Sequence, residues 1–308
     1  MKKSILYYVC GLLMAAPVLS SCSSDDPDTS KSIISTGETE KNDFDRWLEA
    51  NYLNPYNIEF KYRYEANEGD FGYYEVPSKY EDAIKLAHLV KYLCLEPYDK
   101  LAEDGINFTR AYFPKMIYTT GTWRFKNNNT FVLGTAEGGK KIYLMGTNYL
   151  SEYLSSAEDL NNYYLKTIHH EFTHILNQTK PYSASFQQIT GTTYVADSWS
   201  EEPYDTGYLG RGYISAYAQM EDREDFAELV SMYVTNTAEQ WEAWLTEAAQ
   251  TDNDGISGRE LIEEKMQIAY SYMEDEWGIN LDEMRDEIQK RQDDVISGRV
   301  SLDDLTVE

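Results

Sequence analysis

The strongest constraint on this chain is the run His-His-Glu-Phe-Thr-His at positions 169–174, which contains three of its four histidines. Residues four apart share one face of an α-helix, so His170 and His174 can both direct a ring nitrogen toward one metal ion. Glu171 would then lie beside the metal, in the position of a general base. The alternative is an amphipathic helix that is rich in histidine by chance. The pattern therefore favours a helix with a zinc site on one face.

The sequence around this run predicts an amphipathic helix. Ser155 is a candidate N-cap, and Glu158 follows it by three residues, as in a capping box. His169 is rotated by about 100° from His170, so we expect a structural or supporting role for it. Apolar residues form a stripe nearly opposite the other two histidines, and they are Tyr164, Leu165, Ile168, Phe172 and Ile175.

A catalytic zinc ion takes three protein ligands and a water molecule, so the site requires a third ligand. No histidine follows His174, and Asn177 and Lys180 occupy the positions where an extended pattern would place Gly and His. The third ligand is therefore expected to be a carboxylate. The chain contains 53 acidic residues, so composition alone does not select one, and three glutamates are candidates: Glu224, Glu228 and Glu201.

The most informative acidic stretch begins at Tyr217 and leads through Glu224-Asp-Phe-Ala-Glu228 into an apolar run. Glu224 and Glu228 are four residues apart and would share one face of a second helix. One of them can bind the metal while the other accepts a hydrogen bond from a ligand histidine.

The spacing from Tyr217 to Glu224 and on to Phe-Ala-Glu228 resembles that of the lethal-factor-type gluzincin peptidases. This resemblance covers only that block and the block from His170 to His174. It implies that Glu224 is the zinc ligand, Glu228 its support, and Tyr217 the group that assists the transition state as oxyanion donor. Without the spacing, Tyr217 would be one of 27 tyrosines with no assigned role.

The N-terminal residues 1–21 predict a lipoprotein signal peptide. A short basic region precedes an apolar run that ends at Leu19 and is too short to span a bilayer. The following Ser-Ser-Cys22 completes a pattern that resembles a lipobox, the bacterial signal for acylation of the cysteine thiol. The alternative is a plain secretory signal with an incidental cysteine. Residues 22–42 are mostly polar and predict a disordered tether, and 43–308 are expected to form one catalytic domain.

Over its whole length the chain resembles the zinc-binding metallopeptidase lipoproteins described as substrate import-associated zinc metallohydrolases. That family implies an association with a TonB-dependent transporter and its partner lipoprotein. Acidic residues soon after Cys22 resemble the export signals of some surface lipoproteins, which implies an outer-membrane protein exposed at the cell surface. The resemblance rests on the lipobox and on the segments Phe44-Asp-Arg-Trp-Leu, Pro55-Tyr-Asn-Ile-Glu-Phe-Lys-Tyr-Arg-Tyr, His170-Glu-Phe-Thr-His, Glu224-Asp-Phe-Ala-Glu and Trp277-Gly-Ile-Asn-Leu-Asp.

Composition excludes some partners and some covalent links. The net charge of −26 repels nucleic acid and anionic lipid, so neither is an expected partner, and contact with a membrane is expected only through the lipid anchor. Cys10 would leave with the signal peptide and Cys22 would carry lipid. Cys94 then remains as a single free thiol, expected in the core, and no intramolecular disulfide can form.

The remaining pattern predicts an α+β fold with a small mixed sheet above the His-Glu-x-x-His helix and a mostly helical C-terminal lobe. Together with the His-Glu-x-x-His signature, this arrangement resembles the zincin-like metalloprotease fold. A strand at the edge of that sheet would bind an extended substrate backbone. His88, on an early helix, has no second ligand at helical spacing and is expected to be structural. The predicted elements are a helix from 43 that ends at Pro55, a strand over 57–64, a helix from about 78 that ends at Pro97, strands over 111–119, 130–133 and 140–145, and two helices from 257 onward.

Two connecting segments allow more than one interpretation. The stretch 179–212 lies between the two helices proposed to bind metal, and it is either a lid or one wall of a cleft, or a packed irregular excursion. The run Asp252-Asn-Asp-Gly255 suggests calcium, but an EF-hand would need Glu where Leu261 stands, so we expect an interhelical turn.

These observations predict a Zn²⁺-dependent metallohydrolase, a peptidase of the gluzincin type that acts on peptides or glycopeptides at the cell surface. The family resemblance implies that it is linked to nutrient import. The rival hypothesis is a non-catalytic accessory or ligand-binding lipoprotein of an uptake complex, with a structural zinc site. Glu171 argues against the rival, because a structural site needs no base and usually closes with a fourth protein ligand.

Overall fold

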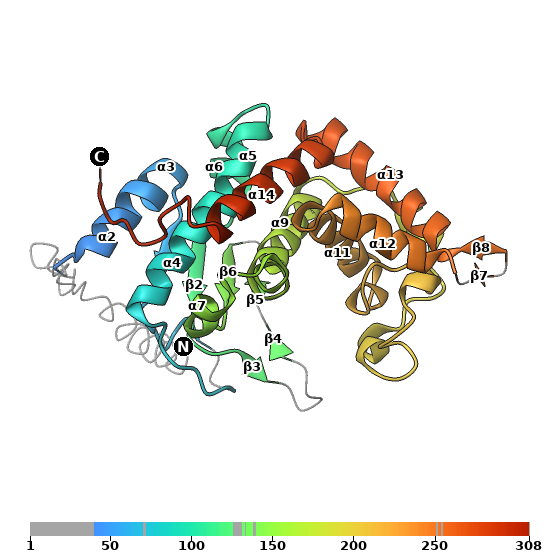
Figure 1. Cartoon of the computed structure of the whole chain (residues 1–308), viewed down its shortest axis with the longest axis horizontal. Coiled ribbons are helices and arrows are strands. Elements are labelled where there is room, and N and C mark those ends of the chain that lie inside the picture. Colours follow the sequence, from blue (N-terminus) through green and yellow to red (C-terminus); the bar gives the residue numbers. More distant parts are fainter. Residues whose placement is uncertain are drawn as a thin grey trace, which may run out of the picture. The chain divides into compact units, whose positions relative to one another are not determined.

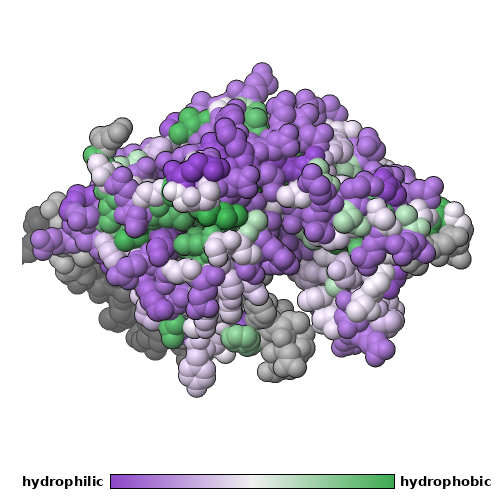
Figure 2. Space-filling view, viewed as in Figure 1, coloured by the Kyte–Doolittle hydropathy of each residue, from purple (hydrophilic) through white to green (hydrophobic). Residues whose placement is uncertain are grey.

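A computed structural model describes residues 40–69, 72–125, 131–132, 134–137, 140–250, 252–253 and 255–307. The predicted signal peptide, the lipidation site Cys22 and nearly all of the predicted tether lie outside these residues. Residues 42–308 form one compact unit. The face shown in Figure 2 is mostly hydrophilic, in keeping with the excess of acidic residues.

The central sheet has four strands in the order β1-β2-β6-β5: β1 (Glu59–Lys61), β2 (Met116–Thr119), β6 (Lys141–Leu144) and β5 (Gly134–Glu137). The first three are parallel, and β5 runs antiparallel to β6 (Figure 1). The sheet is therefore small and mixed, as expected. The strand predicted over 140–145 is internal, and the antiparallel strand β5 occupies the edge of the sheet and contacts the helix that carries the histidines.

Three predicted strands differ from the structure in extent or partner. The strand predicted over 57–64 is confined to β1, and the first residues of the one predicted over 111–119 belong instead to helix α6 (Ile106–Tyr112). The strand predicted over 130–133 pairs as β4 (Phe131–Val132) with β3 (Arg124–Phe125), apart from the central sheet. Alternation of apolar residues indicates burial on one face, but only the partner strands determine where pairing begins and ends.

The helices near the N-terminus continue past both prolines that were expected to end them. Segment η1 (Glu49–Leu53) follows α2 (Asp43–Leu48), and α3 (Asn54–Tyr56) includes Pro55. Likewise α4 (Tyr80–Val90) continues through η2 (Lys91–Leu95) into α5 (Glu96–Leu101), with Pro97 in its first turn. The prediction of two breaks was wrong, because η1 and η2 are wide π-type turns and each proline lies in the first turn of the next segment, where its missing N–H is tolerated.

The central helix consists of α8 (Ala157–Leu160), η4 (Asn161–Leu165) and α9 (Lys166–Thr179). It begins one residue later than predicted, because the side chain of Ser156, not Ser155, accepts a hydrogen bond from the backbone N–H of Asp159. Before it lie η3 (Thr147–Tyr149) and α7 (Leu150–Tyr153). The predicted apolar stripe is buried throughout and contributes to the main core.

The C-terminal half is helical. Helix α11 (Asp222–Thr235) packs along α9, and α12 (Ala238–Ala248), α13 (Gly258–Trp277) and α14 (Leu281–Ile296) follow (Figure 1). The two helices predicted from 257 onward are confirmed, and Ser257 caps α13 in a capping box with Glu260. The turn predicted at 252–255 contains a short hairpin of β7 (Asp252–Asn253) and β8 (Ile256–Ser257).

The stretch 179–212 contains short helices joined by irregular backbone: α10 (Ser185–Ile189), η5 (Ala196–Ser200) and η6 (Leu209–Arg211). Backbone N–H groups of Val195 and Ala196 donate to the carbonyls of Gln219 and Met220, next to the short helix η7 (Tyr217–Gln219). Part of this stretch is therefore fixed against the segment that precedes α11. Within the described residues, no helix has the length and apolar character needed to cross a bilayer.

Candidate metal centre

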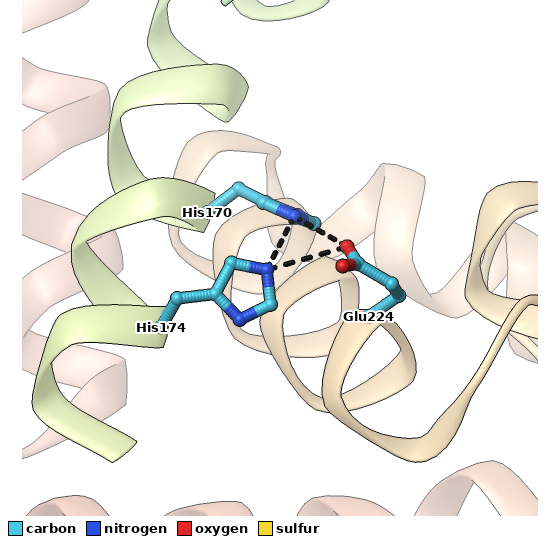
Figure 3. Close-up of side chains that lie close together, drawn as sticks. All are labelled: His170, His174 and Glu224. Atoms are coloured by element: carbon cyan, nitrogen blue, oxygen red, sulfur yellow. Dashed lines mark hydrogen bonds and ion pairs between the residues drawn. The ribbon is translucent and has the colours of Figure 1, made fainter. Parts of the chain in front are cut away.

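His170 and His174 on α9 meet Glu224 in the first turn of α11 (Figure 3). The Nε2 atom of His170 lies 2.9 Å from Oε2 of Glu224, and Nε2 of His174 lies 3.3 Å from the same oxygen. The two Nε2 atoms are 3.0 Å apart. Three atoms that can each donate an electron pair thus point at one another from two different helices.

This geometry fits a zinc ion. Ligand atoms that surround zinc tetrahedrally at about 2.0–2.1 Å lie about 3.3 Å from one another. The three separations in this cluster are 2.9, 3.0 and 3.3 Å, so small side-chain shifts would admit the ion. Among the described residues the cluster holds only these three ligand groups, which leaves a fourth coordination position for water or substrate.

The electrostatics of the cluster keep Glu224 charged. Burial raises the pKa of its carboxyl group, but hydrogen bonds with His170 and His174 outweigh burial and lower the pKa to about 2. Burial lowers the pKa of His170, whereas the carboxylates of Glu224 and Glu228 raise it to about 9. A zinc dication bound by the two histidines and Glu224 would be stabilised by the same two carboxylates.

Glu228 lies one helical turn beyond Glu224 and faces the other nitrogen of His170. Its Oε1 atom is 2.9 Å from His170 Nδ1, and its side chain is almost fully buried. Its Oε2 atom accepts hydrogen bonds from Ser215 Oγ at 2.6 Å and from Lys166 Nζ at 3.2 Å. Burial raises the pKa of Glu228, but the charge of Lys166 and the interactions with His170 and Ser215 outweigh burial and hold the pKa well below its usual value. The buried carboxylate is therefore charged and orients the imidazole.

Tyr217 lies beside the cluster in η7. Its ring centroid is 6.0 Å from that of His170 and 5.1 Å from that of Trp199, which meets it edge to face. Ser215 joins this short helix to Glu228, because its Oγ atom also accepts a hydrogen bond from the N–H of Ala218 at 3.1 Å. Burial, and then the charges of Glu224, Glu228 and Glu171, raise the pKa of Tyr217, so its hydroxyl keeps its proton.

Two histidines lie apart from the cluster. His169 is fully buried, its Nδ1 atom 3.0 Å from the hydroxyl of Tyr98, and burial lowers its pKa to about 4. His88 packs against Trp47 with ring centroids 4.0 Å apart. Both have the structural environment expected for them. Cys94 is a free, buried thiol, as its apolar neighbours indicated.

Of the three carboxylates considered as ligands, the structure brings Glu224 to both histidines. Glu201 is exposed and outside the cluster, and Glu228 contacts only the far nitrogen of His170. Glu171 follows His170 directly on α9 and is partly buried.

Several residues that support the metal centre could not be predicted from the sequence. Lys166 and Ser215 contact Glu228 but belong to no recognisable pattern. Asp225, next to Glu224, forms a fully buried ion pair of 2.6 Å with Lys265 of α13, and it also accepts a hydrogen bond from the Tyr194 hydroxyl. Such contacts join segments far apart in the chain, so only the folded structure reveals them.

Comparison with known proteins supports this chemistry. The profile of the family described as "Putative zinc-binding metallo-peptidase" matches residues 37–282. The crystal structure of a putative zinc-binding metallo-peptidase from Bacteroides caccae ATCC 43185 is similar, with 36% sequence identity and a TM-score of 0.72. The similarity covers 89% of this chain and all of the other. No curated protein matches the chain significantly.

Proposed function

Since the chain belongs to the putative zinc-binding metallo-peptidase family, we propose that it cleaves peptide bonds as a gluzincin, with His170, His174 and Glu224 as zinc ligands. The observation that carries this proposal is the approach of two histidine nitrogens and one carboxylate oxygen to within 3.3 Å of one another. A carboxylate as third ligand distinguishes the gluzincin type from peptidases that use three histidines.

The protein groups have separate tasks in this reaction. Zinc, when bound, would polarise the substrate carbonyl and lower the pKa of a bound water to about 7. Glu171 accepts the proton of the attacking water and passes it to the leaving amine. Glu228 holds His170 through Nδ1, which leaves Nε2 directed at the metal position.

Tyr217 is the proposed oxyanion donor. Its pKa is raised, so its hydroxyl is protonated at neutral pH and can donate a hydrogen bond to a developing negative charge. The contact with Trp199 and the hydrogen bonds of Ser215 fix the short helix on which it lies. A donor held in place before the reaction stabilises the transition state without reorganisation.

We further propose that the protein is an outer-membrane lipoprotein, anchored by acylated Cys22 and exposed at the cell surface. Its substrates would be peptides or glycopeptides, and its partners a TonB-dependent transporter with its lipoprotein. The motifs in the sequence support this proposal. Incorporation of labelled palmitate by the wild type, lost in Cys22→Ser, would test the anchor, and equal labelling of both proteins would rule it out.

The hydrolytic function is tested by zinc analysis combined with cleavage of a peptide library, using Glu171→Gln as the matched variant. We expect one zinc ion per chain in both proteins and cleavage by the wild type alone. Zinc in both proteins with cleavage by neither would instead support the rival role, a ligand-binding accessory lipoprotein with a structural metal.

A further inference from the structure

A pocket of about 360 Å³ opens beside the metal centre, with His174 in its lining. Its walls come from the last turns of α9, from the segment that includes α10, and from the first turn of α11. The pocket thus shares one residue with the proposed zinc site and adjoins another, Glu224. A substrate whose scissile bond lies at the metal would place a neighbouring side chain or its chain end in this space.

Most of the lining surface is apolar, and its polar groups include three amides, one aspartate and one arginine. Asn177 and Gln178 of α9 and Gln187 of α10 contribute amides, and Arg223 contributes an exposed guanidinium group. Asp222 also lines the pocket, but its Oδ2 atom accepts a hydrogen bond of 2.8 Å from the Tyr182 hydroxyl. Amides and a guanidinium group provide hydrogen-bond donors for an acceptor-rich ligand.

Arg223 differs from every other arginine of the chain. The other nine arginines, all within the described residues, hydrogen-bond or pair with a carboxylate, an amide or a carbonyl. The side chain of Arg223 has no ion pair or hydrogen bond with any described residue. In a chain with 53 acidic and 27 basic residues, an arginine next to the metal centre without a carboxylate partner is unusual.

From these observations we propose that Arg223 binds a carboxylate of the substrate, so that the peptidase prefers peptides with an acidic group next to the scissile bond. The planar guanidinium group can bind a carboxylate through two parallel hydrogen bonds, which gives both strength and orientation. The carboxylate belongs either to an Asp or Glu side chain or to the C-terminus of a short peptide. This inference rests on the proposed peptidase function for its biological meaning, but binding can test it without cleavage.

The test uses zinc-loaded protein that carries Glu171→Gln, so that bound peptides remain intact. Fluorescence anisotropy measures the affinity for labelled peptides in which a single Glu is moved through each position, with a Gln peptide as the neutral partner. Each peptide is made with a free and with an amidated C-terminus, which separates the two sources of the carboxylate. We expect that, at one position, the peptide with the carboxylate binds about 10-fold to 100-fold more tightly than its neutral partner. This is the range expected for a charged hydrogen bond.

Variants assign the preference to Arg223. Arg223→Gln should abolish the difference between Glu and Gln peptides while keeping its zinc content, and Arg223→Lys should retain part of it. Lys290→Gln is the control, because Lys290 is exposed on α14 and its replacement changes the net charge equally. Equal affinities for charged and neutral peptides at every position, or a preference that survives in Arg223→Gln, would overturn the inference.

This binding experiment and the cleavage assay with the wild type together separate the inference from the proposed function. If the wild type cleaves peptides but shows no preference for a carboxylate, the inference fails and the peptidase function stands. If carboxylate peptides bind through Arg223 but no peptide is cleaved by the wild type, the inference stands and the hydrolytic function fails.

Discussion

The Oε1 atom of Glu228 lies 2.9 Å from Nδ1 of His170, while Nε2 of the same ring faces Glu224. The imidazole is therefore held from both sides by carboxylates on consecutive turns of α11. A charged partner on the far nitrogen fixes the ring orientation and makes the ligand nitrogen more basic.

Replacing Glu228 with Gln should weaken zinc binding by about 10-fold to 100-fold, because the buried charge behind His170 is lost. Titration against a chelator of known affinity measures the effect. The control is Glu221→Gln, because Glu221 is exposed and lies just before the same helix, and this variant should bind zinc as the wild type does. Equal zinc affinities in all three proteins would show that Glu228 does not support the ligand.

Tyr217→Phe should lower kcat by about 100-fold to 1000-fold and leave KM nearly unchanged, since the lost hydrogen bond forms in the transition state. Steady-state kinetics on a cleaved peptide, at equal zinc content, measure both constants. Tyr112→Phe provides a comparison, because Tyr112 packs against Trp277 and is not part of the metal-ligand cluster. A rise in KM alone would assign Tyr217 to substrate binding.

Zinc should stabilise the fold. A ligand that binds only the native state at 100 times its Kd adds about 2.7 kcal/mol, because α9 and α11 provide the ligands together only when they are packed. Thermal unfolding with zinc and after chelation should therefore differ in Tm. In His174→Ala, which lacks one ligand, the difference should shrink, and an undiminished shift would place the stabilising ion elsewhere.

The buried pair of Lys265 and Asp225 should be strongly coupled. Both side chains are fully buried, so Lys265→Met would leave an unpaired buried carboxylate and cost about 3–5 kcal/mol of unfolding free energy. The double variant Asp225→Asn/Lys265→Met should be destabilised less than the single variant Lys265→Met, because it contains no buried carboxylate that lacks a charged partner. Urea denaturation of the wild type, the two single variants and the double variant gives a double-mutant cycle. Additive changes in unfolding free energy would contradict the coupling.

His88 should make the protein sensitive to mild acid. Burial next to Trp47, and then the charge of Lys91, lower the pKa of His88 from 6.5 to about 4. As pH falls through 6.5, His88 binds a proton in the unfolded chain but stays neutral in the folded chain. The contribution of His88 to stability is therefore fully present above pH 6.5 and is lost as pH falls toward 4. From pH 7 to pH 5 the loss should be at most about 2 kcal/mol, and smaller to the extent that water screens this partly exposed ring.

The comparison for this effect is metal-free His88→Gln, which has no titrating group at the position. Urea unfolding at both pH values should show a smaller loss of unfolding free energy in the variant than in the wild type. Equal losses would mean that His88 is already protonated in the fold, or that it is solvated.

Local spacing predicted much of this protein. The i and i+4 relation of His170 and His174 follows from helix geometry alone, and so do the shared face of Glu224 and Glu228 and the apolar stripe that buries α9. The start of α13 near residue 257 was also predicted, and the capping box found there is local, since Ser257 and Glu260 are three residues apart. These features depend on neighbours within one or two turns, which the sequence displays directly.

Features that depend on distant partners could not be predicted in this way. Pro55 and Pro97 do not end their helices, because each follows a wide π-type turn that a propensity argument does not anticipate. The edge strand is β5 and not the more apolar β6, because the pairing of β2 with β6 occupies the interior. Strand order is set by long-range packing, which leaves little trace in a short stretch of sequence.

The sequence by itself determined the chemical type of the site: two histidines one turn apart, a glutamate between them, and the need for a carboxylate elsewhere. Only the tertiary structure decided which carboxylate. Glu224 is separated from His174 by 50 residues, and its Oε2 atom reaches both histidines because α11 packs along α9. Distances between side chains on one helix are fixed by covalent geometry and helix pitch, whereas distances between two helices are fixed by how their buried faces pack.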